Sequence, residues 1–239
     1  MSVFSGRKLT SHANPALDHW HFAEGTQEPS LWFRFCRGGL RGYFSVLWRV
    51  RVFNRHVEPA TGGAVYISNH QSFLDPILMS YGLRRPMNYM ARDSLFHLPL
   101  FKQLISSVYA FPVKRGTADL SALKEAMRRV KAGGQVVLFA EGTRTQNGRI
   151  GPFLPGVAML AQRTGATTVP VVIDGAFECW PRTQMLPSLG EIVVQYGNPI
   201  PSEESKAMTS EALMTRVRAE MIEMQADIRR RLGRPELKY

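Results

Sequence analysis

The chain has 239 residues, with 30 Lys and Arg against 19 Asp and Glu, and therefore carries a formal net charge of +11. Its 44% hydrophobic and 21% charged residues are typical of a folded domain and argue against disorder. The two cysteines, Cys36 and Cys179, are too few for a disulfide framework or a four-cysteine zinc site. The excess of positive charge favours an anionic partner: nucleic acid, anionic lipid or a phosphorylated substrate.

Residues 1–30 are an irregular lead-in that lacks the charged, apolar and small-residue order of a signal peptide. No run of about 18 apolar residues follows anywhere in the sequence, so a simple transmembrane helix is not expected.

The segment between Pro29 and Val57 combines arginines with aromatic residues and contains no acid. On a helix, one polar stripe is formed by Arg34, Arg37, Arg41, Ser45 and Arg49, beside an apolar face of Phe33, Cys36, Leu40, Phe44 and Leu47. Such a helix can lie in a membrane interface, where its arginines meet anionic lipid. Three glycines (Gly38, Gly39 and Gly42) weaken it, so two short helices with a bend are also possible. The alternative is an ordinary surface helix that caps the core.

After Pro59 short apolar runs alternate with helical patterns. Strands are predicted at Ala64–Ser68, Met87–Ala91, Val108–Val113, Gln135–Ala140, Thr167–Ile173 and Ile192–Tyr196. Helices are predicted at Pro76–Tyr81, Ala118–Lys131, Gly156–Arg163 and about Ser210–Leu232. This alternation predicts an α/β fold with a largely parallel central sheet flanked by helices. We expect residues 1–57 to be the lead-in and membrane-interface segment, and residues 58–239 to be the catalytic domain.

The first chemical candidate is His70 with Asp75, in the loop that follows the strand at Ala64–Ser68. A carboxylate that orients a histidine makes the usual general base for activating a hydroxyl. Asp75 before Pro76 also reads as a helix N-cap, which alone could explain the aspartate.

Two further polar clusters follow strands. Glu141, Gly142, Thr143 and Arg144 come after one, and Lys114 with Arg115 after another. Glycine permits a tight turn, and the arginines offer donors to an anion. Each cluster alone could be a solvated loop, but three at strand ends of one sheet indicate a site.

Four motifs occur in an order that resembles the 1-acylglycerol-3-phosphate acyltransferase (lysophosphatidate acyltransferase) family. They are His70 to Asp75, Phe111 to Arg115, Phe139 to Arg144, and Val169-Pro170-Val171. Three positions depart from the family pattern: Tyr109 replaces a common Gly, Ala140 a Pro, and Leu154 a Lys.

The resemblance implies a transfer of an acyl group from acyl-coenzyme A or acyl carrier protein to a lysophospholipid hydroxyl, without a further cofactor or a metal. His70 would be the base and Asp75 its partner. Substrate binding would fall to Arg115, Glu141, Gly142, Thr143 and Arg144, around the phosphate or glycerol headgroup. A membrane-associated protein, peripheral or monotopic on the cytoplasmic face, is then expected.

Other readings remain open. The acceptor could be another lysophospholipid or a lipid-linked hydroxyl, or the chain could be a non-catalytic membrane-surface protein that keeps the fold. Nucleic acid binding is suggested by charge alone and lacks any recognised motif, so no nucleic acid partner is expected.

Overall fold

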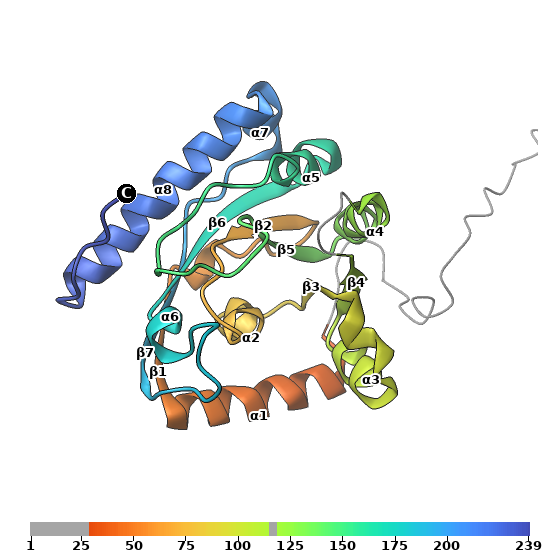
Figure 1. The fold of residues 1–239 in the computed structure, drawn as a ribbon. Coiled ribbons are helices and arrows are strands. Elements are labelled where there is room, and N and C mark those ends of the chain that lie inside the picture. Colours follow the sequence, from red (N-terminus) through yellow and green to blue (C-terminus); the bar gives the residue numbers. More distant parts are fainter. Residues whose placement is uncertain (1–28, 115–118) are drawn as a thin grey trace, which may run out of the picture.

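A computed structural model describes residues 29–114 and 119–239, which form a seven-stranded sheet with helices on both faces (Figure 1). The strands are β1 (Trp48–Phe53), β2 (Ala64–Ser68), β3 (Met87–Arg92), β4 (Ala110–Val113), β5 (Gln135–Phe139), β6 (Thr167–Asp174) and β7 (Gly190–Tyr196). The helices are α1 (Leu31–Leu47), α2 (Asp75–Tyr81), α3 (Pro99–Ser107), α4 (Leu120–Lys131), α5 (Val157–Thr164), α6 (Ala176–Cys179), α7 (Ser202–Ala207) and α8 (Ser210–Arg231). The described residues also form two 3-10 helices, η1 (Arg55–Val57) and η2 (Asp93–His97).

The sheet has the strand order β1-β7-β6-β2-β5-β3-β4. All neighbouring strands are parallel except β6 and β7. The carboxyl ends of β2, β5 and β6 therefore lie side by side at one edge of the sheet, which is where ligands bind in open α/β sheets. The predicted α/β fold with a largely parallel sheet is confirmed.

Hydrophobic residues of the central strands point alternately into two cores. On one face of the sheet, Val65 and Ile67 of β2 pack with α4, α5 and α8. On the other face, Ala64 and Tyr66 of the same strand pack with α1, α2 and α6. Burial on both faces explains why the strand reads as a continuous apolar run.

The N-terminal segment differs from the expectation first in where its helix ends. α1 is a single helix that ends at Leu47, and Arg49 lies in β1, which pairs in parallel with β7. The prediction that Arg49 continues the helical stripe is therefore wrong. Residues 48–53 alternate apolar and basic side chains at Trp48, Arg49, Val50 and Arg51, the period of an edge strand with one face on the core.

Arg37 and Arg41 of α1 face the body of the protein, whereas Arg34 of the same helix is exposed. The guanidinium of Arg37 donates to the carbonyl oxygens of Leu83 (3.1 Å) and Arg84 (2.6 Å), and that of Arg41 donates to Leu83 (3.0 Å). Phe33 and Phe44 are buried on the same side of the helix. Part of the predicted polar stripe thus fastens α1 to the loop after α2, and is not directed toward a membrane.

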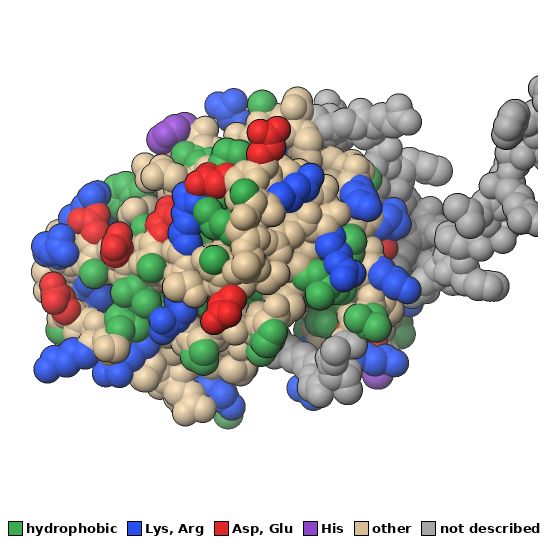
Figure 2. Space-filling view, turned by 90° about the horizontal axis from the view of Figure 1, so that it is seen from above, with side chains coloured by type: hydrophobic (Ala, Val, Ile, Leu, Met, Phe, Trp, Pro, Cys, Tyr) green, Lys and Arg blue, Asp and Glu red, His purple; other side chains and the backbone are tan. Residues whose placement is uncertain are grey.

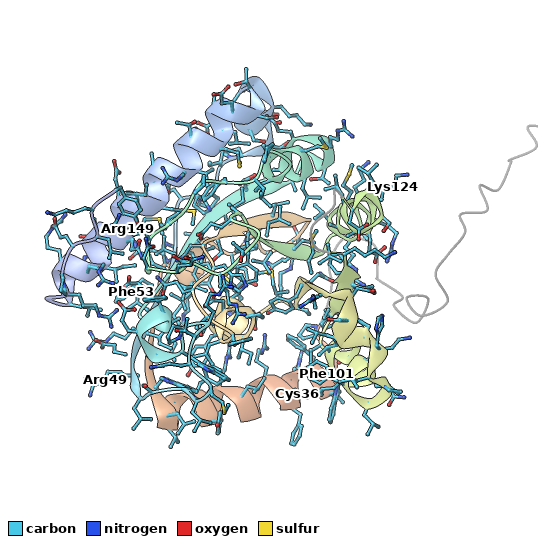
Figure 3. The ribbon with its side chains drawn as sticks, viewed as in Figure 1. Cys36, Arg49, Phe53, Phe101, Lys124 and Arg149 are labelled. Carbon is cyan, nitrogen blue, oxygen red and sulfur yellow. The ribbon has the colours of Figure 1, made fainter. Side chains whose placement is uncertain are left out.

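The outward side of α1 is apolar instead. Leu31 and Val46 are each 83% exposed and Phe35 is 74% exposed, with Trp32 and Tyr43 beside them. The indole of Trp32 donates to the hydroxyl of Ser107 (2.9 Å), which places the start of α1 beside the end of α3. The exposed Leu100 and Phe101 of α3 extend the apolar surface. Figure 3 shows Cys36 of α1 and Phe101 of α3 at this same end of the molecule.

A third part of the same surface is the loop before β7. The indole of Trp48, at the end of α1, donates to the carbonyl of Ser188 (2.9 Å), and the neighbouring Met185, Leu186 and Leu189 are all exposed. We call the exposed apolar side chains of α1, α3 and this loop the α1 apolar surface. The opposite face, with α5, α7 and α8, mixes basic, acidic and hydrophobic side chains (Figure 2).

Candidate active site

His70 lies in the loop between β2 and α2, beside Asp75, the first residue of α2. The Nδ1 atom of His70 is 2.6 Å from Oδ2 of Asp75, and both side chains are buried. Asp75 Oδ2 also accepts hydrogen bonds from the backbone amides of Gln71 (2.6 Å) and Ser72 (2.8 Å). The carboxylate thereby fixes both the loop and the histidine ring.

The helix begins at Asp75 itself, with Leu74 as the N-cap residue, so the expected N-cap position of Asp75 is shifted by one residue. The carboxylate makes no hydrogen bond to an amide of the first helical turn, so the interpretation of Asp75 as an N-cap is wrong. Its partners are the amides of Gln71 and Ser72, which precede the helix, and the ring of His70. The contact with His70 therefore supports the interpretation of Asp75 as the partner of the histidine.

The histidine ring is held from a second side by a stacked phenylalanine. The ring of Phe139, the last residue of β5, lies 4.1 Å from the His70 ring, centroid to centroid, at an interplanar angle of 18°. With Nδ1 engaged by Asp75, Nε2 is the nitrogen placed to take a proton. No hydrogen bond to Nε2 is formed within the described part of the chain.

Glu141 ties the loop after β5 to the histidine loop. One oxygen accepts from the amide of His70 (3.0 Å) and the other from the amide of Gly151 (3.1 Å). Burial raises the pKa of this carboxyl, while the two amide hydrogen bonds act in the opposite direction. The amide of Thr145 also donates to the carbonyl of His70 (2.8 Å), so the two loops are joined on both sides of the histidine.

Arg144 reaches the histidine loop from the loop after β5. Its guanidinium carbon lies 3.5 Å from the centroid of the ring of Phe73, a residue that falls between His70 and Asp75 in the sequence. Thr143 is exposed beside it. The structure therefore brings together His70, Asp75, Glu141 and Arg144, whereas Arg115 lies outside the described residues.

Several buried polar side chains near His70 are not among the predicted site residues. Asn69 exchanges two hydrogen bonds with the backbone of Ile173 in β6 (2.8 and 2.9 Å). Gln71 donates to the carbonyl of Gly148 (3.0 Å) and accepts from the amide of Phe177 (3.1 Å). These contacts fix the histidine loop against two neighbouring segments. Their only sequence signal is a run of polar residues where the strand leaves the core.

Two of the departures from the family pattern have a structural consequence. Tyr109 has φ of 71°, in the left-handed region where glycine is ordinarily found, and its ring packs edge-on against Phe33 of α1 (5.2 Å). Leu154 covers Gly142, whose added Cβ would lie 2.4 Å from Leu154 Cδ1. A leucine at this position fills space beside the loop where a lysine would supply charge.

Gly142→Ala is expected to lower the free energy of unfolding by about 1–2 kcal/mol, because Gly142 has φ of 67° and alanine is strained there. This corresponds to a fall in melting temperature of roughly 2–8 °C for a chain of this size. Gly38→Ala is the matched control, since this helical glycine has nothing within 4 Å of an added Cβ and should stabilise α1.

Thermal unfolding of both variants checks this prediction. The double variant Gly142→Ala/Leu154→Ala separates backbone strain from the clash with Leu154. Full recovery of the melting temperature in the double variant would contradict a backbone origin.

The described residues hold no group of three or more His, Cys, Asp or Glu side chains that could bind a metal ion. Among the described helices, none combines the length and the apolar composition needed to span a bilayer.

Comparison with known proteins identifies the family. The acyltransferase family profile matches residues 49–174, which include both loops of the site. A Bacillus subtilis protein named 1-acyl-sn-glycerol-3-phosphate acyltransferase is 30% identical over 191 residues, covering 78% of this chain and 95% of that protein. Chloroplastic LPAT1 of Arabidopsis thaliana is 32% identical over 158 residues, and BAT2 of Brassica napus is 32% identical over 151 residues.

The matched region spans less than half of these two plant relatives, 42% of LPAT1 and 44% of BAT2. The fold resembles the crystal structure of the LPA acyltransferase PlsC from Thermotoga maritima, with a TM-score of 0.69 and 22% identity. That match covers 82% of this chain and 81% of the other. The profile match and the Bacillus relative together show that the chain belongs to the acyltransferase family.

Proposed function

We propose that the protein transfers a fatty acyl group from an acyl thioester to the free hydroxyl of 1-acylglycerol-3-phosphate, giving phosphatidic acid. The observation that carries the proposal is the 2.6 Å contact between His70 Nδ1 and Asp75 Oδ2, at the carboxyl end of the sheet and beside Arg144. The names of the relatives support lysophosphatidate as the acceptor.

His70 acts as the general base in this mechanism. Nε2 takes the proton of the acceptor hydroxyl as its oxygen attacks the thioester carbonyl, and Asp75 stabilises the imidazolium that forms. When the tetrahedral intermediate collapses, the carbon–sulfur bond breaks and the imidazolium returns its proton to the departing thiolate. The thiol is that of coenzyme A or of acyl carrier protein, and the reaction requires no further cofactor or metal.

The acceptor phosphate binds at the loop after β5 in this proposal. Arg144 and Arg115 supply positive charge, and a phosphate pairs well with guanidinium groups. Gly142 and Thr143 form the part of the loop that the headgroup approaches. Glu141 borders the headgroup and holds the loop in place through the amides of His70 and Gly151.

A lipid acceptor requires access to a membrane, and we propose that the α1 apolar surface provides it. Exposed Trp, Tyr, Phe and Leu side chains are the types that enter the headgroup and acyl boundary of a bilayer. Residues 1–57 would be the membrane-interface segment and residues 58–239 the transferase domain. The protein would bind, as a peripheral or monotopic protein, to an anionic membrane from the cytoplasmic face.

A panel of donors and acceptors tests the proposal. Purified protein is assayed with acyl-coenzyme A and acyl carrier protein donors against lysophosphatidate, other lysophospholipids and lipid-linked hydroxyls. We expect lysophosphatidate to be acylated with a kcat/KM at least about tenfold above that of lysolipids lacking a terminal phosphate, because those lysolipids lack the anionic group that the arginines would bind. Faster turnover of another acceptor would overturn the assignment. If the protein binds vesicles but transfers no acyl group with any combination of donor and acceptor, a non-catalytic membrane-surface protein is favoured.

A further inference from the structure

A cavity of about 440 Å³ lies behind the loop after β5, between this loop, α8 and Tyr239. Arg144 and Arg149 of the loop line it, together with Arg218 of α8. We call it the three-arginine cavity. Figure 3 shows Arg149 on the loop beside α8, away from the end of the molecule that carries Cys36 and Phe101. Its volume is within the usual range for small-molecule sites.

The three-arginine cavity is strongly cationic. Its only acidic lining residue, Glu141, already uses both oxygens on the amides of His70 and Gly151. Arg218 donates to the carbonyls of Gly151 (2.9 Å) and Ile150 (3.0 Å), which orient the guanidinium without neutralising it. In the described ranges 29–114 and 119–239, neither Arg149 nor Arg218 forms an ion pair. An anionic ligand would supply the missing charge.

An aromatic ring completes the cavity wall. Tyr239 is 51% exposed, and its hydroxyl is fixed by the amide of Ile150 (3.1 Å) and by the side chain of Gln225. The ring centroid lies 6.0 Å from the Arg218 guanidinium. A fixed, half-exposed aromatic ring beside several arginines is the combination that binds nucleotides, with the base on the ring and phosphates on the guanidinium groups.

We propose that the three-arginine cavity binds the nucleotide end of a coenzyme A thioester. Its phosphates lie on Arg149 and Arg218 and its adenine on Tyr239, which leaves Arg144 to the acceptor phosphate, and the pantetheine arm runs from the cavity toward His70. The proposal rests on the proposed function, because it assumes a thioester donor. Lysophosphatidate carries one phosphate and no base, and acyl carrier protein carries a phosphopantetheine without adenine. Neither therefore uses both the arginines and the aromatic ring.

Direct binding of coenzyme A, measured by calorimetry on the full chain, tests the site independently of transfer. Arg149→Ala should weaken binding of coenzyme A by about tenfold or more, because it removes a charged hydrogen-bond donor from the cavity. The Arg149 side chain is exposed, so its removal should leave the fold intact. Arg163→Ala, on the exposed side of α5, is the matched control and should leave binding unchanged. Adenosine 3′,5′-bisphosphate should compete with coenzyme A for wild-type protein.

A pair of substitutions at Tyr239 isolates the ring. Tyr239→Phe and Tyr239→Leu both lose the hydroxyl, but only the phenylalanine keeps an aromatic face. We expect Tyr239→Phe to bind coenzyme A several-fold more tightly than Tyr239→Leu. Equal affinities, with both variants folded by circular dichroism, would overturn the assignment of the adenine to this ring.

Steady-state kinetics then separate the possible ligands. In Arg149→Ala the KM for acyl-coenzyme A should rise about tenfold, while kcat and the KM values for lysophosphatidate and acyl carrier protein donors stay unchanged. A rise in the KM for lysophosphatidate instead would make the cavity an acceptor site and overturn the proposal. So would failure of wild-type protein to bind coenzyme A, even if acyl carrier protein supports transfer. Coenzyme A binding with this mutational pattern but without any transfer would refute the proposed function and leave the cavity assignment standing.

Discussion

His70→Ala is expected to lower kcat/KM for acyl transfer by about 10³-fold or more, because removal of a positioned general base costs roughly 10²–10⁴ in rate. The alanine removes Nε2, the atom that we propose takes the hydroxyl proton, and leaves Asp75 with its two amide partners. The fold should persist, since the loop remains joined to the rest of the site through Asn69 and Gln71. Initial rates over a range of donor and acceptor concentrations below and above KM, together with a melting curve, check this expectation.

The chain offers a matched control for this substitution. His97 and Asp93 form a second His–Asp pair on η2, with Nε2 3.4 Å from Oδ2 and the histidine 71% exposed. Because this pair is exposed to solvent on the 3-10 helix that follows β3, His97→Ala should leave kcat unchanged. Equal losses from His70→Ala and His97→Ala would contradict the assignment of the base.

Asp75→Asn tests the orienting role without a large change in shape. The asparagine oxygen can still accept from the Gln71 and Ser72 amides, but the charge that stabilises the imidazolium is lost. We expect kcat to fall roughly 10²- to 10⁴-fold with little change in the KM of the acceptor. A fall confined to KM would instead place Asp75 in substrate binding.

The central part of the fold was predictable from the sequence because its strands are buried on both faces. The strand at Ala64–Ser68 was predicted with its observed bounds. Five consecutive apolar or small residues between polar loops indicate a strand that is buried on both faces, as in a parallel sheet. The edge strand β1 was missed. Arg49 follows Arg41 and Ser45 at four-residue spacing, which indicates a continued helix. The alternation of Trp48, Arg49, Val50 and Arg51 that indicates a strand covers only a few residues, so the helical pattern concealed it.

The orientation of α1 could not be predicted either. The periodicity shows an amphipathic helix, but both of its sides carry aromatic residues. Phe33 is buried against Tyr109, and Arg37 against the carbonyls of Leu83 and Arg84. Those partners are far away in the sequence and produce no local pattern. The site shows the same limit: His70 and Asp75 are close in sequence, whereas the Glu141 contact joins segments 71 residues apart.

This orientation changes the expected basis of membrane binding. The arginine-rich stripe predicts that charge drives association with anionic lipid, so that high salt or loss of Arg34, Arg37 and Arg41 would weaken the association. In the structure Arg37 and Arg41 hold α1 to the body, Arg34 is exposed, and the outward side of the helix is apolar. Insertion of the α1 apolar surface should therefore dominate, with a smaller contribution from salt-sensitive attraction.

Phe35→Glu is accordingly expected to weaken binding to anionic vesicles by about tenfold or more, because a buried phenylalanine contributes about 1.5–3 kcal/mol and a carboxylate opposes entry. Leu120→Glu makes the same kind of change at an exposed residue of α4, outside the α1 apolar surface, and should bind normally. Sedimentation with vesicles at low and high salt measures both variants. If Phe35→Glu binds like wild type while high salt releases the protein, charge and not apolar insertion carries the attachment. Transfer to a lysophosphatidate dispersed in detergent should survive Phe35→Glu, because Phe35 is exposed on the outward side of α1 and its substitution removes only access to the membrane.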